Sequence, residues 1–207
     1  MSKTLYLSGL DDVLNNAKFY NKAGYRFDIN KLVDYMRRQN DIVQRQFISV
    51  MYMIDCIETD VNNLCEIVSN QYKTEHKIAN KAIQDSVYNY LAKVDSLIDY
   101  VDKLSNKISV NKNSFDRKNI DTAVKIGNYR DEVLHEGIPF IHVKNVGERR
   151  AYGGSVCCQM ADEIIFEKAY IEIEFLENKK IDLNTLINTT VSPIKEKINK
   201  YFENLLI

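Results

Sequence analysis

Hydrophobic residues recur along two long stretches of the chain at alternating intervals of three and four residues. This heptad spacing is typical of helices that pack side by side, because it keeps the apolar side chains on one face. The positions of the first stretch are Val33, Met36, Asn40, Val43, Phe47, Val50, Ile54, Ile57, Val61, Leu64 and Val68. Those of the second stretch are Ile83, Val87, Tyr90, Val94, Leu97, Val101, Leu104 and Ile108.

The two stretches predict a long antiparallel helical hairpin. The first contains neither proline nor glycine between Asn30 and Asn70, and Asn40 is its single polar position. We therefore expect one helix of about forty residues, roughly 60 Å long. The pattern lapses at residues 70–74, where a short polar link allows the second helix to return along the first. The acidic residues of the second helix are expected at its solvated surface: Asp85, Asp95, Asp99 and Asp102.

The segments around the hairpin predict further short elements. Residues 1 to about 26 are expected to form an arm with one short helix, capped by Ser8 together with Asp11. A third helix is expected to start at Asn113 or Ser114 and to end at Gly137, since Pro139 cannot continue it.

The pattern changes after Pro139. The segment 140–143 is β-branched and apolar, and the segment 171–175 alternates between apolar and acidic residues, so both are expected to be strands. Between them, residues 147–154 are expected to form a basic turn with glycines, while 160–170 can be helical. We interpret 138–180 as a small strand-containing insert in a single domain, 1–207, of mainly α class. Pro193 is expected to open the closing helix of this up-and-down helical bundle.

The charge, the cysteines, the histidines and the apolar content of the chain limit the functions that the sequence allows. The formal net charge of the 207 residues is −1, so binding to RNA or DNA requires a local basic patch. The four cysteines lack metal-ligand spacing, and Cys56 and Cys65 are expected to be buried free thiols. The three histidines have no paired spacing, so we expect neither a metal nor a cofactor. No apolar run approaches the length of a membrane span, which favours a cytoplasmic protein.

Candidate chemistry gathers near the end of the third helix. Motifs such as GxGxxG, the Walker loop, HExxH and GxSxG do not occur in the sequence. Asp131 and His135 are four residues apart, which places them on one helical face, and Asn128 extends that face by one turn. Arg130 instead continues an apolar row with Ile126. A cation in such a row needs an acidic or phosphate partner, which an aspartate of the second helix can supply.

The segment Arg130-Asp131-Glu132-Val133-Leu134-His135 resembles the motif of the HEPN domain family, an arginine and a polar residue followed by a histidine. In this family the motif lies on a late helix of an all-helical bundle that contains a long hairpin. The resemblance covers roughly residues 28–137 and the final helix. Where a subset of family toxins has tyrosine two residues after the histidine, this chain has Gly137.

The resemblance implies a metal-independent endoribonuclease that acts in defence or in a toxin–antitoxin pair. It also implies RNA as the substrate, a homodimer with a composite site, and an antitoxin or a nucleotidyltransferase as protein partner. In such a nuclease the 2′-hydroxyl of the RNA is the nucleophile. His135 suits proton transfer because imidazole titrates near neutrality, Asp131 can orient its ring, and Arg130 can stabilise the phosphoryl charge. Asn128, Arg149 and Arg150 are candidate RNA contacts.

The helical geometry adds an expectation about assembly. On an ideal helix Arg130 and His135 lie about 140° apart in azimuth and about 7.5 Å apart in rise. One helix therefore does not aim both side chains at one phosphate. Two motif helices that line a shared cleft across a twofold axis can do so, which predicts a homodimer.

Several alternatives remain open at this point. The chain can be a non-catalytic HEPN-like scaffold that binds a protein partner or a nucleotide, or a plain coiled-coil adaptor. Arg130 can be a structural ion-pair residue, and His135 can be a cation that caps the helix C-terminus. Arg149 and Arg150 can belong to an ordinary solvated loop.

Overall fold

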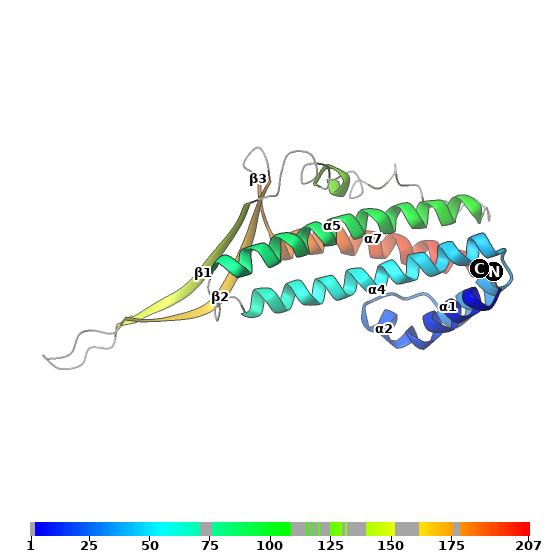
Figure 1. Ribbon diagram of the computed structural model, residues 1–207, viewed down its shortest axis with the longest axis horizontal. Coiled ribbons are helices and arrows are strands. Elements are labelled where there is room, and N and C mark those ends of the chain that lie inside the picture. The colour runs from blue at the N-terminus through cyan, green and yellow to red at the C-terminus, as the bar shows by residue number, and fades with distance from the viewer. Residues whose placement is uncertain are drawn as a thin grey trace, which may run out of the picture.

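The computed structural model describes residues 3–70, 76–108, 115, 117, 120, 125–129, 131, 140–151, 162–175 and 179–207. The chain is mostly helical, as predicted (Figure 1). The helices are α1 (Lys3–Asn15), α2 (Ala17–Lys22), α3 (Ile29–Arg37), α4 (Asp41–Asn70), α5 (His76–Lys107) and α7 (Leu183–Leu205). The strands are β1 (Phe140–Ala151), β2 (Asp162–Phe175) and β3 (Lys179–Asp182).

Helices α4 and α5 form the predicted antiparallel hairpin, and α7 lies along it (Figure 1). The heptad positions of α5 from Val87 onward are buried, as the periodicity requires. Aromatic rings join the elements at one end of the core. The Phe202 ring of α7 meets the Phe47 ring of α4 at a centroid distance of 5.9 Å and the Phe27 ring at 4.9 Å, both edge to face.

The expectation of one continuous helix from Asp28 to Asn70 is wrong, because the chain breaks at Asn40. Helix α3 ends at Arg37 and α4 begins at Asp41. The Oδ1 atom of Asn40 accepts hydrogen bonds of 3.1 Å from the backbone N–H groups of Ile42 and Val43. Asn40 therefore caps the N-terminus of α4 and satisfies two donors that would otherwise lack partners.

The N-terminal segment is part of the core and not an arm. It forms two helices, and Ser8 lies inside α1 and does not precede it. Leu10 of α1 and Tyr20 of α2 are fully buried, and the Tyr20 hydroxyl donates a 3.2 Å hydrogen bond to Asp55 of α4. The chain then turns at Gly24, whose φ of 88° lies in the region that favours glycine.

The predicted strand-containing insert is present as an antiparallel sheet of order β1-β2-β3. Strands β1 and β2 are both longer than expected. Residues 147–151 belong to β1 and are not part of a turn, and residues 162–170 are strand and not helix. Ile173, near the base of β2, is fully buried. From this base the β1–β2 ribbon projects beyond the ends of α4 and α5 (Figure 1).

The closing helix begins ten residues earlier than expected. Asp182 caps α7 by accepting hydrogen bonds from the backbone N–H groups of Asn184 (2.9 Å) and Thr185 (3.4 Å). Pro193 consequently lies inside the helix and does not open it. The predicted apolar face is buried at Ile194, Ile198, Tyr201, Phe202 and Leu205.

Two smaller expectations concern cysteines and membranes. Cys56 is only half-buried and Cys65 is exposed, so the prediction of buried thiols is wrong for Cys65. Cys157 and Cys158 lie outside the described residues. Among the helices that the structure describes, none combines the length and the apolar character needed to cross a membrane.

Candidate functional site

The candidate site contains two predicted residues that can be placed and two that cannot. Asn128 and Asp131 are helical and exposed. Arg130 and His135 lie outside the described residues, as do both expected N-caps of the third helix. The described helical residues 125–129 and 131 are called the motif segment below.

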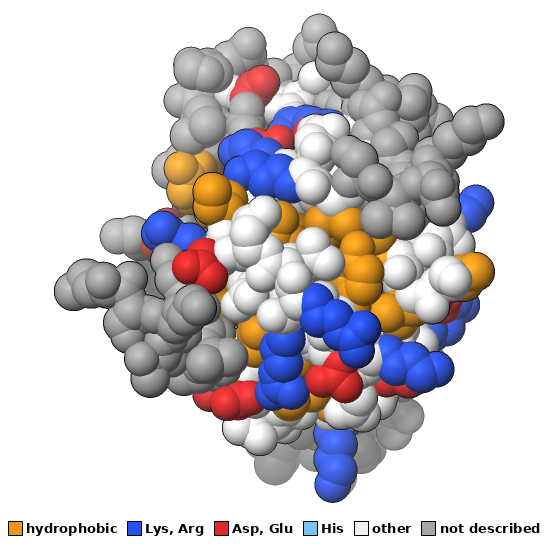
Figure 2. All heavy atoms as spheres, turned by 90° about the vertical axis from the view of Figure 1, so that its right-hand side faces the viewer, with side chains coloured by type: hydrophobic (Ala, Val, Ile, Leu, Met, Phe, Trp, Pro, Cys, Tyr) orange, Lys and Arg blue, Asp and Glu red, His pale blue; other side chains and the backbone are white. Residues whose placement is uncertain are grey.

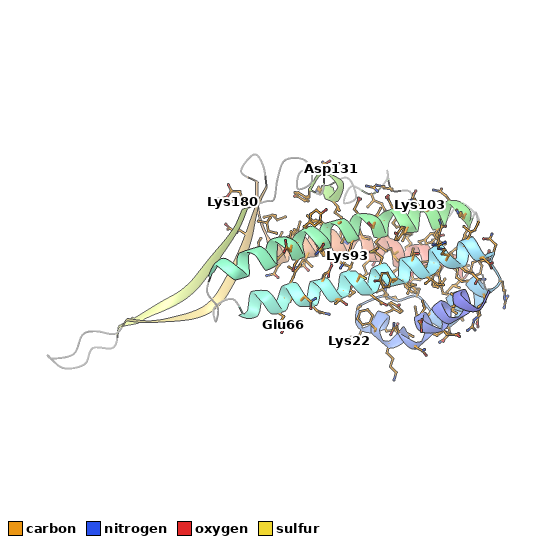
Figure 3. The ribbon with its side chains drawn as sticks, in the orientation of Figure 1. Lys22, Glu66, Lys93, Lys103, Asp131 and Lys180 are labelled. Carbon is orange, nitrogen blue, oxygen red and sulfur yellow. The ribbon has the colours of Figure 1, made fainter. Side chains whose placement is uncertain are left out.

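The motif segment packs on the bundle through one side and presents polar residues on the other. Ile126 is fully buried, and Tyr129 is half-buried against the core. Asn128 and Asp131 are three residues apart on the exposed side, as the helical spacing predicts. In Figure 3 Asp131 lies above α5, on the side of the bundle where β3 carries Lys180. Asn128 and Asp131 are therefore both on the surface of the described part of the chain.

An arginine that the sequence did not single out links this region to α5. The Nη2 atom of Arg117 donates a 2.6 Å hydrogen bond to Oδ1 of Asp95, and Nη1 donates to Oδ1 of Asp99. The backbone N–H of Arg117 also donates to Oδ1 of Asp102, at 3.2 Å. The Asp95 side chain is only 4% exposed, whereas those of Asp99 and Arg117 are 39% and 32% exposed. The buried carboxylate of Asp95 is thus compensated by a charge-assisted hydrogen bond.

These contacts correct the expectation for the acidic residues of α5. Asp95 is buried and ion-paired and does not lie at the solvated surface. A signal was present in the sequence, because Asp95, Asp99 and Asp102 follow one another at intervals of four and three and thus share a helical face. Three carboxylates on one helical face repel one another, so a nearby cation is expected. The sequence alone did not show that Arg117 supplies it.

Two further contacts fix the same connection to the bundle. The backbone N–H of Phe115 donates a 2.8 Å hydrogen bond to the Ser105 hydroxyl of α5. The Phe115 ring meets the Tyr201 ring of α7 at a centroid distance of 6.2 Å. A Cβ atom placed on Gly127 would lie 3.8 Å from Nη2 of Arg117, so the motif segment passes close to the guanidinium. The motif segment is thus packed on the bundle through Ile126 and passes beside Arg117, which is bound to α5.

The candidate RNA contacts Arg149 and Arg150 are not brought together with the motif segment. Both lie in β1, where Arg149 pairs with Ile164 and Arg150 with Glu163 of β2. Their segment is the distal end of the ribbon, which Figure 1 shows well separated from the motif segment along the long axis of the molecule. Within one copy of the chain, the two groups of candidate residues therefore cannot contact the same nucleotide.

A second group of polar residues lies between the N-terminal helices, α4 and α7. Nζ of Lys195 is 2.7 Å from Oε1 of Glu58 and 5.0 Å from the centre of the Tyr25 ring. Burial raises the pKa of Asp55, and the hydrogen bond from the Tyr20 hydroxyl partly opposes this rise. Oδ1 of Asp55 is buried without a hydrogen-bond donor in the described part of the chain. These contacts hold the 20–25 segment against the hairpin.

Charge on the described surface is mixed in sign. Figure 2 views the end of the bundle where both termini lie, and there Lys and Arg side chains alternate with Asp and Glu around hydrophobic groups. The exposed hydrophobic residues of the described chain include Ile42 and Ile207. No group of three or more His, Cys, Asp or Glu side chains with the geometry of a metal site occurs among the described residues.

Comparison with protein-family models, with curated proteins and with solved structures found no match to this chain.

Proposed function

We propose that the protein is a metal-independent endoribonuclease of HEPN type that acts in defence or in a toxin–antitoxin system. The observation that carries the proposal is the order Arg130-Asp131 followed by His135 in the sequence that comes after a long antiparallel helical hairpin. The exposure of Asn128 and Asp131 supports it, because a polar face that cuts RNA must be reachable by a polymer.

In this mechanism the RNA supplies its own nucleophile. The 2′-oxygen attacks the neighbouring phosphorus, a new P–O2′ bond forms, and the P–O5′ bond breaks. The 2′-hydroxyl loses one proton, and the departing 5′-oxygen gains one. His135 transfers these protons, Arg130 stabilises the charge on the phosphoryl oxygens, and Asp131 orients the imidazole. The products are a 2′,3′-cyclic phosphate and a 5′-hydroxyl.

The contacts of Arg117 support this assignment by giving the motif segment a fixed position. Catalytic groups need to be held within a fraction of an ångström, and a helix packed on a rigid scaffold achieves this better than a loop. Here Ile126 is buried in the core, and Arg117 is tied to Asp95 and Asp99 beside Gly127. The motif segment is thus packed on the helical hairpin.

The catalytic assignment is tested by cleavage of mixed-sequence RNA in excess chelator. Arg130→Ala and His135→Ala should each reduce the rate by roughly two to four orders of magnitude. Asp131→Asn should lose less, because it keeps a hydrogen-bonding group. Matched controls are Arg45→Ala and His142→Ala, which remove the same residue types elsewhere and should leave the rate unchanged.

Two outcomes would redirect the proposal. Activity that disappears with the chelator would contradict the mechanism. No cleavage by a folded protein under any condition would favour the alternative, a non-catalytic helical scaffold of the same type that binds a protein or a nucleotide.

RNA binding by the ribbon is a second part of the proposal. Arg149 and Arg150 are adjacent cations near the end of β1 and are candidates for phosphate contacts. Replacement of both with alanine should weaken RNA binding and reduce the slope of log K against log salt by about one to two. The matched control is Lys22→Ala with Lys31→Ala, which removes two exposed cations, one in α2 and one in α3. An unchanged slope would show that Arg149 and Arg150 do not contact RNA phosphates.

The proposal includes a homodimer in which the two motif helices line a shared cleft, and an antitoxin or nucleotidyltransferase as protein partner. On an ideal helix Arg130 and His135 are separated by about 140° in azimuth, which favours such a shared cleft. Mixing inactive Arg130→Ala and His135→Ala chains should restore part of the activity if each cleft takes the two residues from different copies. Absence of any restoration would argue for a site within one copy.

A further inference from the structure

Residues 17–27, called the strap below, consist of α2 and the turn that leads toward α3. Tyr20, Tyr25 and Phe27 of the strap are buried. In Figure 1 α2 lies on the outer side of α4, away from α5. The strap is therefore a layer outside the α4–α5 hairpin, and its separation from α4 would leave the contact between these two helices in place.

Hydrogen bonds from α7 hold the turn of the strap. The side-chain amide of Asn199 makes two of them: Nδ2 donates to the Gly24 carbonyl at 3.3 Å, and Oδ1 accepts from the backbone N–H of Arg26 at 2.9 Å. Nζ of Lys195 donates to the carbonyl oxygen of Ala23. Amides do not titrate and lysine titrates near pH 10, so these contacts do not change between about pH 4 and about pH 8.

The contact of the strap with α4 differs because it contains a carboxyl group. The Tyr20 hydroxyl donates a 3.2 Å hydrogen bond to Oδ2 of Asp55. Oδ1 of Asp55 is buried and has no hydrogen-bond donor among the described residues. A buried oxygen without a donor costs more free energy on an ionised carboxylate than on a neutral carboxyl group. The closed strap therefore favours the protonated form of Asp55.

The charged and titratable groups around Asp55 do not reverse this preference. Glu58 lies on the same face of α4, three residues on, and its Oε1 is 2.7 Å from Nζ of Lys195 on α7. Tyr25 of the strap interacts electrostatically with both carboxylates, and Tyr90 of α5 interacts with Glu58. Burial raises the pKa of both tyrosines, so their hydroxyls stay neutral. Lys195 is thus balanced by Glu58, and an ionised Asp55 adds a second negative charge to the group.

We propose that Asp55 is a proton-dependent latch, whose protonated carboxyl keeps the strap closed on α4 and whose ionised carboxylate lets the strap open more readily. Opening exposes Oδ1 to water, which solvates the negative charge, so opening is linked to the loss of one proton. The pKa of Asp55 in the closed form is raised by burial, and the hydrogen bond from Tyr20 opposes part of this rise. The latch goes beyond the proposed function and does not depend on RNA cleavage.

The sign of the pH dependence follows from this linkage. The extra stability of the closed strap is fully present below the pKa of the open form, which is about 3.9 for a hydrated aspartate. It is lost as the pH rises through the higher pKa of the closed form. Between these two values, each opening releases one proton, so the equilibrium constant for opening rises by up to about tenfold per pH unit.

Hydrogen exchange measured by mass spectrometry from about pH 4 to about pH 8 tests the latch, with each rate divided by the intrinsic rate at that pH. Protection of the strap amides should fall by up to about tenfold per pH unit within the window and then level off. Asp55→Asn cannot ionise and should lack this fall. Asp60→Asn is the matched control, because it makes the same change on α4 at a carboxylate that pairs with Lys93 of α5, and it should keep the fall.

A second variant changes the latch without removing its carboxyl group. Tyr20→Phe deletes the hydroxyl that stabilises the ionised form of Asp55, so the fall in strap protection should extend to higher pH than in the wild type. Amides in the buried part of α5 report on the hairpin in the same samples. Their protection should not follow the strap, because the strap opens while the hairpin stays folded.

The latch is overturned if strap protection in the wild type does not fall with pH, or if Asp55→Asn shows the same fall. An α5 that loses protection in parallel with the strap would also overturn it, because the whole protein would then be unfolding. If Asp55→Asn does not fold, Tyr20→Phe decides the question, since a pH dependence identical to that of the wild type contradicts the proposed contact.

Discussion

Replacement of Arg117 by methionine tests whether α5 holds the segment that leads to the motif. Methionine keeps the apolar stem and removes the guanidinium. The backbone hydrogen bond from residue 117 to Asp102 does not depend on the side chain and should remain. Among the side-chain hydrogen bonds of the described residues, the variant therefore removes those to Asp95 and Asp99.

The expected loss follows from the burial of the two carboxylates. Asp99 is 39% exposed, so water replaces the guanidinium there and the loss is at most about 1 kcal/mol. Asp95 is 4% exposed, and a hydrogen bond to such a charged group contributes about 1.5–3 kcal/mol. Because the Arg117 side chain is itself 32% exposed, water screens its interactions with both carboxylates, and each loss is smaller than these values. We expect Arg117→Met to lower the free energy of unfolding by roughly 2–3 kcal/mol.

The assay is urea unfolding at pH 7 followed by circular dichroism, with Asp95→Asn in both backgrounds. Asparagine removes the buried charge, so it should cost less in the Arg117→Met background than in the wild type, with a coupling of about 1–2 kcal/mol. Arg45→Met, at an exposed arginine of α4, is the control and should stay within about 0.5 kcal/mol of wild type. A loss in Arg117→Met no larger than that control, or strictly additive effects, would refute the reasoning.

Three further predictions concern other positions. Gly24→Ala should destabilise the protein by about 1–2 kcal/mol because φ is 88°, whereas Gly127→Ala, inside a helix with room for a Cβ atom, should be neutral or stabilising in the same melts. Asn40→Ala should cost about 1 kcal/mol through loss of the α4 cap, and Asn40→Asp, which can still accept both hydrogen bonds, should restore most of it. Burial raises the pKa of the Asp55 carboxyl in the folded protein. The folded protein therefore binds a proton at Asp55 more tightly than the unfolded chain does. The wild type consequently loses stability as the pH rises from the unfolded to the folded pKa of Asp55. The difference in Tm between Asp55→Asn and wild type should therefore favour the variant more at pH 7 than at pH 3, and the opposite trend would contradict the assignment.

The helical hairpin was predictable because its determinants are local. Apolar residues at steps of three and four define a buried face without reference to the rest of the chain, and Tyr90, Val94 and Val101 are buried as expected. The break at Asn40 was missed for a related reason. Asparagine is compatible with a polar position in a heptad pattern and with an N-cap, and the apolar spacing continues across both α3 and α4.

The ribbon was only partly predictable. The clean alternation of residues 171–175 indicated a strand. Farther along β2, Ile164, Ile165 and Phe166 are consecutive and Glu167 is an extra residue, so the alternation disappears although the strand continues. Gly147 suggested a turn, but it lies beside the bulge, where glycine is also common.

The candidate site shows the same division between local and long-range information. The helical face of Asn128 and Asp131 followed from spacing. Arg117 and Asp95 are 22 positions apart in the sequence and meet only because their two segments pack together. No local sequence pattern predicts this contact. In the same way, the hydrogen bond from Tyr20 of α2 to Asp55 of α4 joins two segments, and the sequence of the first 26 residues does not reveal it.

A matched pair of substrates tests whether RNA is cut by its own 2′-hydroxyl. Wild-type protein in excess chelator is incubated with an RNA and with the same sequence carrying 2′-deoxyribose at each nucleotide, and the ends of any products are analysed. If the 2′-hydroxyl is the nucleophile, the RNA is cut to 2′,3′-cyclic phosphate and 5′-hydroxyl ends and the 2′-deoxy strand stays intact. Cleavage of the 2′-deoxy strand, or RNA products with 5′-phosphate ends, would contradict it.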